Sequence, residues 1–126
     1  MGSTTSQASG RTFQATAVAI PAYSLVTLDS SGTISVSGDN ATEQIIGVST
    51  EDIAASGYGN VQLLNAGGTI EVLCGGNTIA VADTCYVDGQ GKIGTDSSNT
   101  KIGVALQASS ADGDVIELLP HQTFLA

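Results

Sequence analysis

The sequence has no tryptophan, few other aromatic residues and little charge. Of its 126 residues only 12% are charged and 4% are aromatic, and three basic residues face twelve acidic ones. The basic residues are Arg11, Lys92 and Lys101, and the formal net charge is −9. Because nucleic acid and anionic membranes are bound through clustered Lys and Arg, this shortage argues against both as partners.

Long apolar runs are also missing. The longest nearly apolar stretch, residues 15–22, contains Pro21 and falls well short of the roughly 20 residues that span a bilayer. The first ten residues are small and polar, so we expect no signal peptide or membrane anchor there. These features predict a soluble protein made in the cytoplasm.

Cysteine and histidine are too scarce for a metal site or a cofactor. Cys74 and Cys85 fall in predicted strands, and cytoplasmic synthesis predicts that both are buried, reduced thiols, with a cross-strand disulfide as the alternative. These two residues and the single His121 do not have the paired ligand spacing of zinc sites. We therefore expect neither a metal nor a cofactor.

No set of residues suggests catalysis. There is no Gly-x-Ser-x-Gly motif, and His121, beside Pro120, is expected to be an exposed tail residue. Asp29 and Asp88 occupy predicted turns, where an Asp side chain accepts backbone N–H bonds. The Asp112-Gly-Asp114 segment lacks the further oxygen ligands of a calcium loop, so we expect a solvated loop.

Three other motifs have ordinary structural explanations. Residues 57–59 (Gly-Tyr-Gly) and 89–91 (Gly-Gln-Gly) open no helix, so they predict β-turns and not phosphate-binding loops. Lys92 lies between Gly and Ile and lacks the flanking residues of biotinyl and lipoyl carrier domains. The glycosylation sequon at residues 40–42 is discounted because no secretory signal precedes it.

An internal repeat is the most informative feature. Residues 20–34 align without a gap on residues 79–93, with identities that include Asp29 with Asp88 and Gly32 with Gly91. Each copy continues to an Ile-Gly-Val, at residues 46–48 and 102–104, and then to a small-residue loop and an apolar strand. Upstream, residues 12–14 resemble residues 69–71 as a lead-in strand. Two copies are too few for a solenoid, so the repeat indicates a duplication spanning about residues 12–64 and 69–119.

The pattern predicts an all-β fold, a single compact barrel or sandwich built from two related halves. Apolar alternation with a period of two, interrupted by turn residues, predicts around ten short strands. Only residues 50–56 have helical character, with Thr50 as a possible N-cap and Gly57 as the stop. Before this β domain, at residues 12–126, we expect a flexible N-terminal arm over residues 1–11.

The order of these motifs resembles the capsid cement, or head decoration, proteins of tailed double-stranded DNA phages. The similarity rests on the Val-x-Leu-Asp-x-x-Gly-x-Ile run that ends at Ile34, on both Ile-Gly-Val segments and on the closing apolar strands. It covers residues 12–119, although the first copy has Pro21-Ala-Tyr-Ser24 where the family often has a glycine.

The resemblance implies a structural virion protein that binds the outer surface of the capsid. It implies synthesis in the host cytoplasm, homotrimers at three-fold positions, the major capsid protein as partner, and stabilisation of the head. We expect the arm to add along a capsid strand edge. The expected capsid contacts are Ser3, Thr4, Thr5, Ser6, Gln7, Arg11, Thr12, Phe13 and Gln14. Phe124 and Leu125 are the expected oligomer contacts, because these apolar side chains near the C-terminus should pack either into the domain or against a neighbouring chain.

A carbohydrate- or surface-binding β-module of a tail or envelope structure is the alternative. Sugar sites usually present exposed aromatic platforms, and this chain has only three Tyr and two Phe residues. The composition therefore favours the capsid protein. An enzyme is the least favoured class, because no base, nucleophile and anion-stabilising group can be assembled.

Overall fold

The computed structural model describes residues 10–38 and 45–120, and in this part of the chain it is built almost entirely of β-strands. The elements are β1 (Gly10–Ala15), β2 (Leu25–Leu28), β3 (Thr33–Val36), β4 (Ile45–Ser49), β5 (Tyr58–Leu63), the 3-10 turn η2 (Leu64–Ala66), β6 (Ile70–Leu73), β7 (Thr84–Gly89), β8 (Lys92–Gly94), β9 (Lys101–Ala105) and β10 (Val115–Pro120). The all-β prediction, with about ten short strands, is confirmed.

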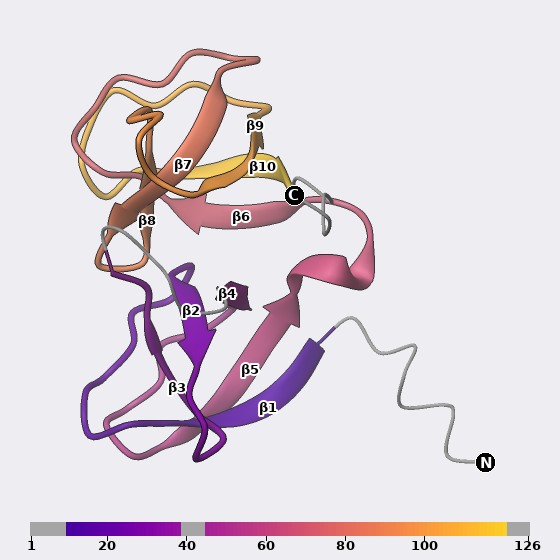
Figure 1. The fold of residues 1–126 in the computed structure, drawn as a ribbon, viewed down its shortest axis with the longest axis vertical. Helices are drawn as coiled ribbons and strands as arrows, with labels where there is room; N and C mark the ends of the chain where they lie inside the picture. The colour runs from indigo at the N-terminus through magenta and orange to yellow at the C-terminus, as the bar shows by residue number, and fades with distance from the viewer. Residues whose placement is uncertain (1–9, 39–44, 121–126) are drawn as a thin grey trace.

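The first half of the chain forms a closed five-stranded barrel in the order β1-β3-β2-β4-β5. All neighbours are antiparallel except β1 and β3, which pair in parallel at Gln14 with Thr33 and Ala15 with Ile34. This short parallel contact closes the barrel, which occupies the lower part of Figure 1.

The second half repeats this arrangement in a five-stranded sheet of order β6-β10-β9-β7-β8. Its outer strands approach each other through a single parallel bridge between Cys74 and Ile93. These residues lie 59 positions after Ala15 and Ile34, the pair that closes the barrel. The halves therefore stack as two similar bodies, and they do not complete one barrel between them (Figure 1).

The registers of the two halves agree strand by strand. Val26 opposite Gly47 in the first half corresponds to Cys85 opposite Gly103 in the second. The isolated bridge between Ile20 and Ile53 corresponds to the one between Ile79 and Ser109. The sequence comparison of the lead-in strands placed Phe13 with Ile70. In the structure, the bridges that close the two halves match Ala15 with Cys74, so Phe13 corresponds to Val72. Origin by duplication stays a prediction, which this repeated register supports.

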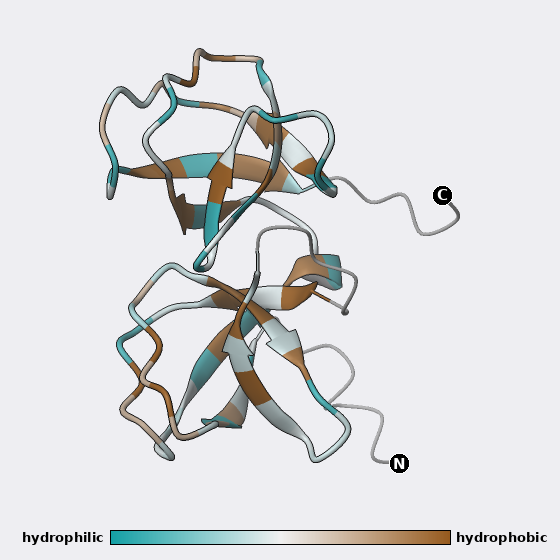
Figure 2. Ribbon diagram, turned by 60° about the vertical axis from the view of Figure 1, so that its left-hand side comes forward, coloured by the Kyte–Doolittle hydropathy of each residue, from teal (hydrophilic) through white to brown (hydrophobic). Residues whose placement is uncertain are grey.

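The glycine of each Ile-Gly-Val motif is required because the neighbouring strand packs closely against it. A Cβ atom on Gly47 would lie 2.2 Å from the backbone oxygen of Gln62 on β5, and one on Gly103 would lie 2.2 Å from that of Leu119 on β10. Neither position has room for a side chain. Other strands, such as β7 and β10, alternate buried and more exposed residues. Figure 2 shows brown apolar segments interspersed with paler and teal ones along the strands.

Each half has its own apolar core, and two barrel residues join them. The first core contains Phe13, Val26 and Ile34, among others. The second contains Val72, Cys85 and Ile93, together with Leu25 and Val48 from the barrel. Leu25 and Val48 are opposite each other on β2 and β4, and both are almost completely buried. The two halves are thus held together by shared hydrophobic packing.

Backbone hydrogen bonds reinforce this junction. The N–H of Leu25 donates to the oxygen of Gly91 at 2.8 Å, and the N–H of Gly91 donates to the oxygen of Ser37 at 3.1 Å. Gly91 has φ +76°, and a Cβ atom there would lie 2.7 Å from that of Ser24, so only glycine fits. The predicted turn at residues 89–91 is confirmed, and its glycine also docks one half onto the other.

The predicted helix at residues 50–56 is wrong. Ile53 forms an isolated bridge with Ile20, with both N–H to oxygen distances at 2.8 Å, and it is buried in the first core. Ser56 has φ +59°, which a helix does not allow. In so short a segment, burying Ile53 in the barrel outweighs weak local helix propensity.

Two other turn predictions need correction. Tyr58 and Gly59 belong to β5 and are not part of a turn, because they pair with Gln14 and Phe13 of β1. Position 59 is a glycine because Ile53 packs where a side chain would be. Asp29 accepts the N–H groups of Ser31 and Thr33, as predicted. Asp88 does not repeat this pattern, since its carboxylate lies against Gly75 and Gly94.

Candidate functional site

The first candidate surface is the edge of β1. This strand pairs with β5 from Gly10 to Gln14, but with β3 only at Gln14 and Ala15. Within the described residues, no strand therefore pairs with the β3-facing edge over residues 10–13. Such an edge carries backbone groups that another extended chain can pair with. In Figure 1 the chain enters β1 from the N-terminal side.

The side chains of β1 divide between core and surface. Phe13 is only 8% exposed and packs in the barrel core, so it can contribute backbone but little side-chain surface to a partner. The Arg11 guanidinium carbon lies 4.9 Å from the centre of the Phe13 ring, a cation–π contact. Arg11 and Thr12 are exposed, and Gln14 donates a hydrogen bond from Nε2 to the oxygen of Ser56.

Some expected contacts lie outside the described residues. These are Ser3, Thr4, Thr5, Ser6 and Gln7 of the arm and Phe124 and Leu125 near the C-terminus. The discounted sequon residues Asn40 and Thr42 and the single His121 also lie outside the described residues. The structure therefore brings together only Arg11, Thr12, Phe13 and Gln14 of the predicted set, all on one strand.

A groove at the junction of the halves is a second candidate surface, and sequence reasoning missed it. Its volume is about 380 Å³, and its lining includes Tyr23, Val48, Gln62, Glu71 and Glu117. Tyr23 has φ +66° and is held by two backbone bonds of 2.8 Å, donated by its own N–H to Ser49 and by the N–H of Leu73 to its oxygen. The groove thus forms where β6 and β10 meet the barrel.

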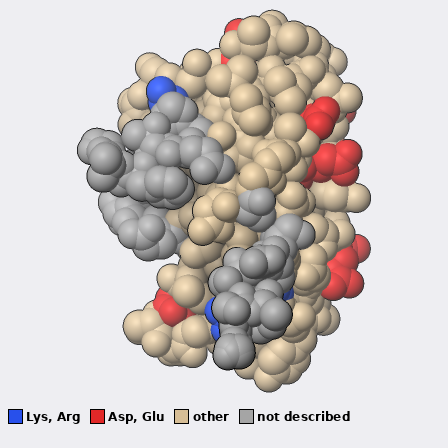
Figure 3. All heavy atoms as spheres, turned by 90° about the vertical axis from the view of Figure 1, so that its right-hand side faces the viewer, with Lys and Arg blue, Asp and Glu red and all other residues tan. Residues whose placement is uncertain are grey.

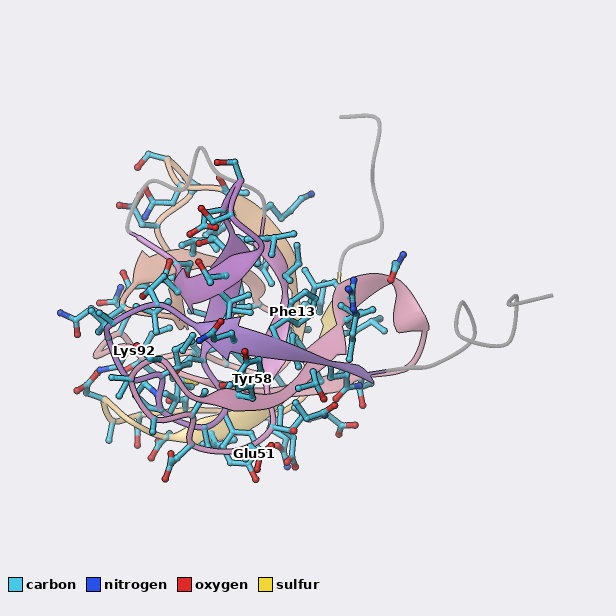
Figure 4. All side chains as sticks on the ribbon, turned by 90° about the horizontal axis from the view of Figure 1, so that it is seen from below. Phe13, Glu51, Tyr58 and Lys92 are labelled. Atoms are coloured by element: carbon cyan, nitrogen blue, oxygen red, sulfur yellow. The ribbon has the colours of Figure 1, made fainter. Side chains whose placement is uncertain are left out.

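Exposed apolar side chains are scattered over the surface. Tyr58 is 70% exposed, and in the view of Figure 4 it lies between Phe13 and Glu51, while Lys92 lies at the left. Val18 and Val81 are 64% and 60% exposed. A single exposed tyrosine on β5 is a poor match for the aromatic platforms of sugar sites.

The acidic side chains form no metal-binding cluster in the described segments. Asp112 forms an ion pair with Lys92 at 3.0 Å, and Asp114 accepts the N–H groups of Ser110 and Ala111. Over residues 10–38 and 45–120, no three His, Cys, Asp or Glu side chains gather as metal ligands would. The hydroxyl and N–H of Thr33 hold the pKa of Asp29 below its ordinary value, as expected for a turn carboxylate.

Both cysteines are completely buried in the second core and form no disulfide. Burial raises the pKa of both thiols, that of Cys85 to about 11, with the neighbouring Cys74 adding to the effect.

No helix in the described part of the chain is long and apolar enough to cross a membrane.

This environment predicts that the thiols react slowly. At pH 8 the native protein should react with a disulfide reagent such as dithiobisnitrobenzoate far more slowly than the unfolded protein in guanidinium chloride, which should release two equivalents of chromophore. Burial and a scarcity of thiolate both cause the delay. Rapid reaction of either thiol in the native protein would contradict it.

Comparison with known proteins identifies the family. The sequence matches the phage cement protein family over residues 4–120. The chain belongs to this family. It is therefore a structural protein of the phage virion, and the resemblance inferred from the repeat motifs is confirmed.

The fold of this cement protein family member also occurs in a solved phage structure. The crystal structure of the head fiber gp8.5 N base in bacteriophage phi29 is similar, with a TM-score of 0.70 and 20% sequence identity. The match covers 93% of this chain and 98% of that one. No curated protein sequence matched. At this identity the likeness concerns the fold, and it includes both halves.

Proposed function

We propose that this protein is a decoration protein that binds the outer surface of the major capsid shell and stabilises the head. The observation that carries the proposal is the family match over residues 4–120, which includes both halves and reaches into the arm. We further propose homotrimers at three-fold positions. Three modest contacts on one trimer act as a single tight site, because the second and third contacts form intramolecularly.

The capsid contact in this proposal is the arm together with β1. The open edge at residues 10–13 supports it, since an arm pairing with a capsid strand would continue directly into β1. Backbone hydrogen bonds supply the affinity, which agrees with the burial of the Phe13 side chain. The exposed Arg11 and Thr12 are available for side-chain contacts.

Proline substitutions test this contact. The variant Thr4→Pro/Thr5→Pro removes two successive N–H donors. In an extended chain these two N–H groups point to opposite edges, so the edge that pairs with the capsid loses one donor in either case. We expect its occupancy on purified heads that lack the protein to fall at least about tenfold, while the matched Thr4→Ala/Thr5→Ala variant keeps wild-type occupancy.

Deletion of residues 2–9 should lower occupancy as strongly as the proline substitutions do, because it removes the part of the arm that precedes β1 and leaves β1 whole. An unchanged Tm would show that the fold is intact. Full occupancy by both the proline and the deletion variants would refute the role of the arm, without affecting the family assignment.

The structure offers little support for a carbohydrate-binding module. Tyr58 is the one strongly exposed aromatic side chain in the described segments, and no second ring accompanies it as a platform. Binding to a glycan array that is lost in Tyr58→Ala would favour that alternative.

A further inference from the structure

We infer that the groove at the junction of the halves receives an arginine or lysine side chain of the capsid protein. The inference rests on the proposed function and adds a second contact, separate from the arm and β1. It is carried by the volume and lining of the groove and by a pair of carboxylates that have no basic partner among the described residues.

The two carboxylates are direct neighbours. Glu71 on β6 and Glu117 on β10 lie opposite each other in the antiparallel register, and both line the groove. Like charges that face each other across two strands destabilise a sheet. The pair therefore lowers the stability of the free protein, and a cation placed between the two would reverse that effect.

Nothing described in the chain supplies this cation. Over residues 10–38 and 45–120 the one ion pair joins Lys92 to Asp112, so neither glutamate has a basic partner there. Arg11 instead lies over the Phe13 ring. Figure 3 shows several separate clusters of acidic atoms, most of them along the right-hand margin, on a face that is otherwise mostly uncharged.

One carboxylate is held in position. The hydroxyl of Thr69 donates to Oε2 of Glu117 at 2.5 Å, and the side-chain amide of Gln107 accepts the Glu117 N–H at 2.7 Å. Gln62 donates from Nε2 to the oxygen of Thr69 at 3.1 Å, which links the barrel to this arrangement. Glu117 is thus oriented before any ligand binds, which lowers the entropic cost of binding.

The lining of the groove also includes the aromatic residue Tyr23. Val48 and Ile70 border the groove too, but they are only 2% and 3% exposed and add little aliphatic surface. Arginine and lysine suit this lining, since their cationic head is attracted to carboxylates and to aromatic faces. A metal ion fits less well, because within the described residues no third acidic, His or Cys side chain joins the two carboxylates.

The double variant Glu71→Gln/Glu117→Gln tests this inference. Its affinity for purified heads that lack the protein should fall at least about tenfold, and its Tm should rise by about 1–3 °C because the repulsion is gone. The matched variant Asp96→Asn/Asp112→Asn changes the net charge equally at positions outside the groove, and its affinity should stay within about twofold of wild type.

A second measurement separates this inference from the proposed function. Titration of the ¹⁵N-labelled wild-type protein with acetyl-arginine amide should shift the Gln62 side-chain amide and the Tyr23 backbone amide, and the double Gln variant should lose these shifts. Wild-type affinity of the double Gln variant for heads, or no shift in the titration, would overturn the inference. If shifts occur but the wild-type protein does not bind heads, the proposed function fails and the cation site stands.

Discussion

Replacing Gly103 with alanine is expected to cost about 3 kcal/mol or more of unfolding free energy. The new Cβ atom would lie 2.2 Å from the backbone oxygen of Leu119 and 3.0 Å from its carbonyl carbon. Both are backbone atoms of the neighbouring strand, so no side chain can rotate away. β9 and β10 would have to separate, with loss of their hydrogen bonds.

The repeat supplies a second test of the same effect. Gly47→Ala places a Cβ atom 2.2 Å from the oxygen of Gln62 and should destabilise the barrel as strongly. Gly76→Ala is the matched control, because nothing lies within 4 Å of the new atom. We expect the control to stay within about 0.5 kcal/mol of wild type in denaturant unfolding. Equal midpoints for all three variants would show that strand packing is not the reason for the glycine.

Leu25→Ala is expected to destabilise both halves together, by about 2–5 kcal/mol. Leu25 is completely buried, and although it belongs to β2 of the barrel, its side chain packs in the core of the second half. Its truncation would leave a cavity at the shared junction. In hydrogen exchange, amides of β9 and β10 should therefore lose protection along with those of the barrel strands.

Leu28→Ala is the control for this effect. Leu28 lies on the same strand but is 37% exposed, so its truncation should cost less than about 1 kcal/mol. If Leu25→Ala lowered protection in the barrel alone, or gave two separate unfolding transitions, the halves would be independent domains.

Much of this fold could be predicted because the same signals occur twice. The Asp29 to Gly32 turn and the residue alternation on either side define a hairpin from local sequence alone. The strand count follows from these signals. The helix prediction for residues 50–56 failed because a long-range contact determines the conformation there. The bridge from Ile53 to Ile20 joins residues 33 positions apart.

The candidate surfaces depend even more on long-range contacts, so less of them could be predicted from the sequence. The β1 edge was predictable as a lead-in strand, whereas the burial of Phe13 depends on how the barrel closes. The groove could not be found from the sequence, because Tyr23 and Glu117 meet only when the second half docks on the first. Glu71 and Glu117 both occur at outward positions of predicted strands, but only the register of β6 with β10 makes them neighbours.

The most direct test of the proposed function is to add the purified protein to heads that lack it and to image them by cryo-electron microscopy. We expect saturable density on the outer surface of the shell, at three-fold positions with three copies each, and decorated heads that release their DNA at a higher temperature than bare heads. Bare shells at saturating protein, or density confined to the interior, would contradict it.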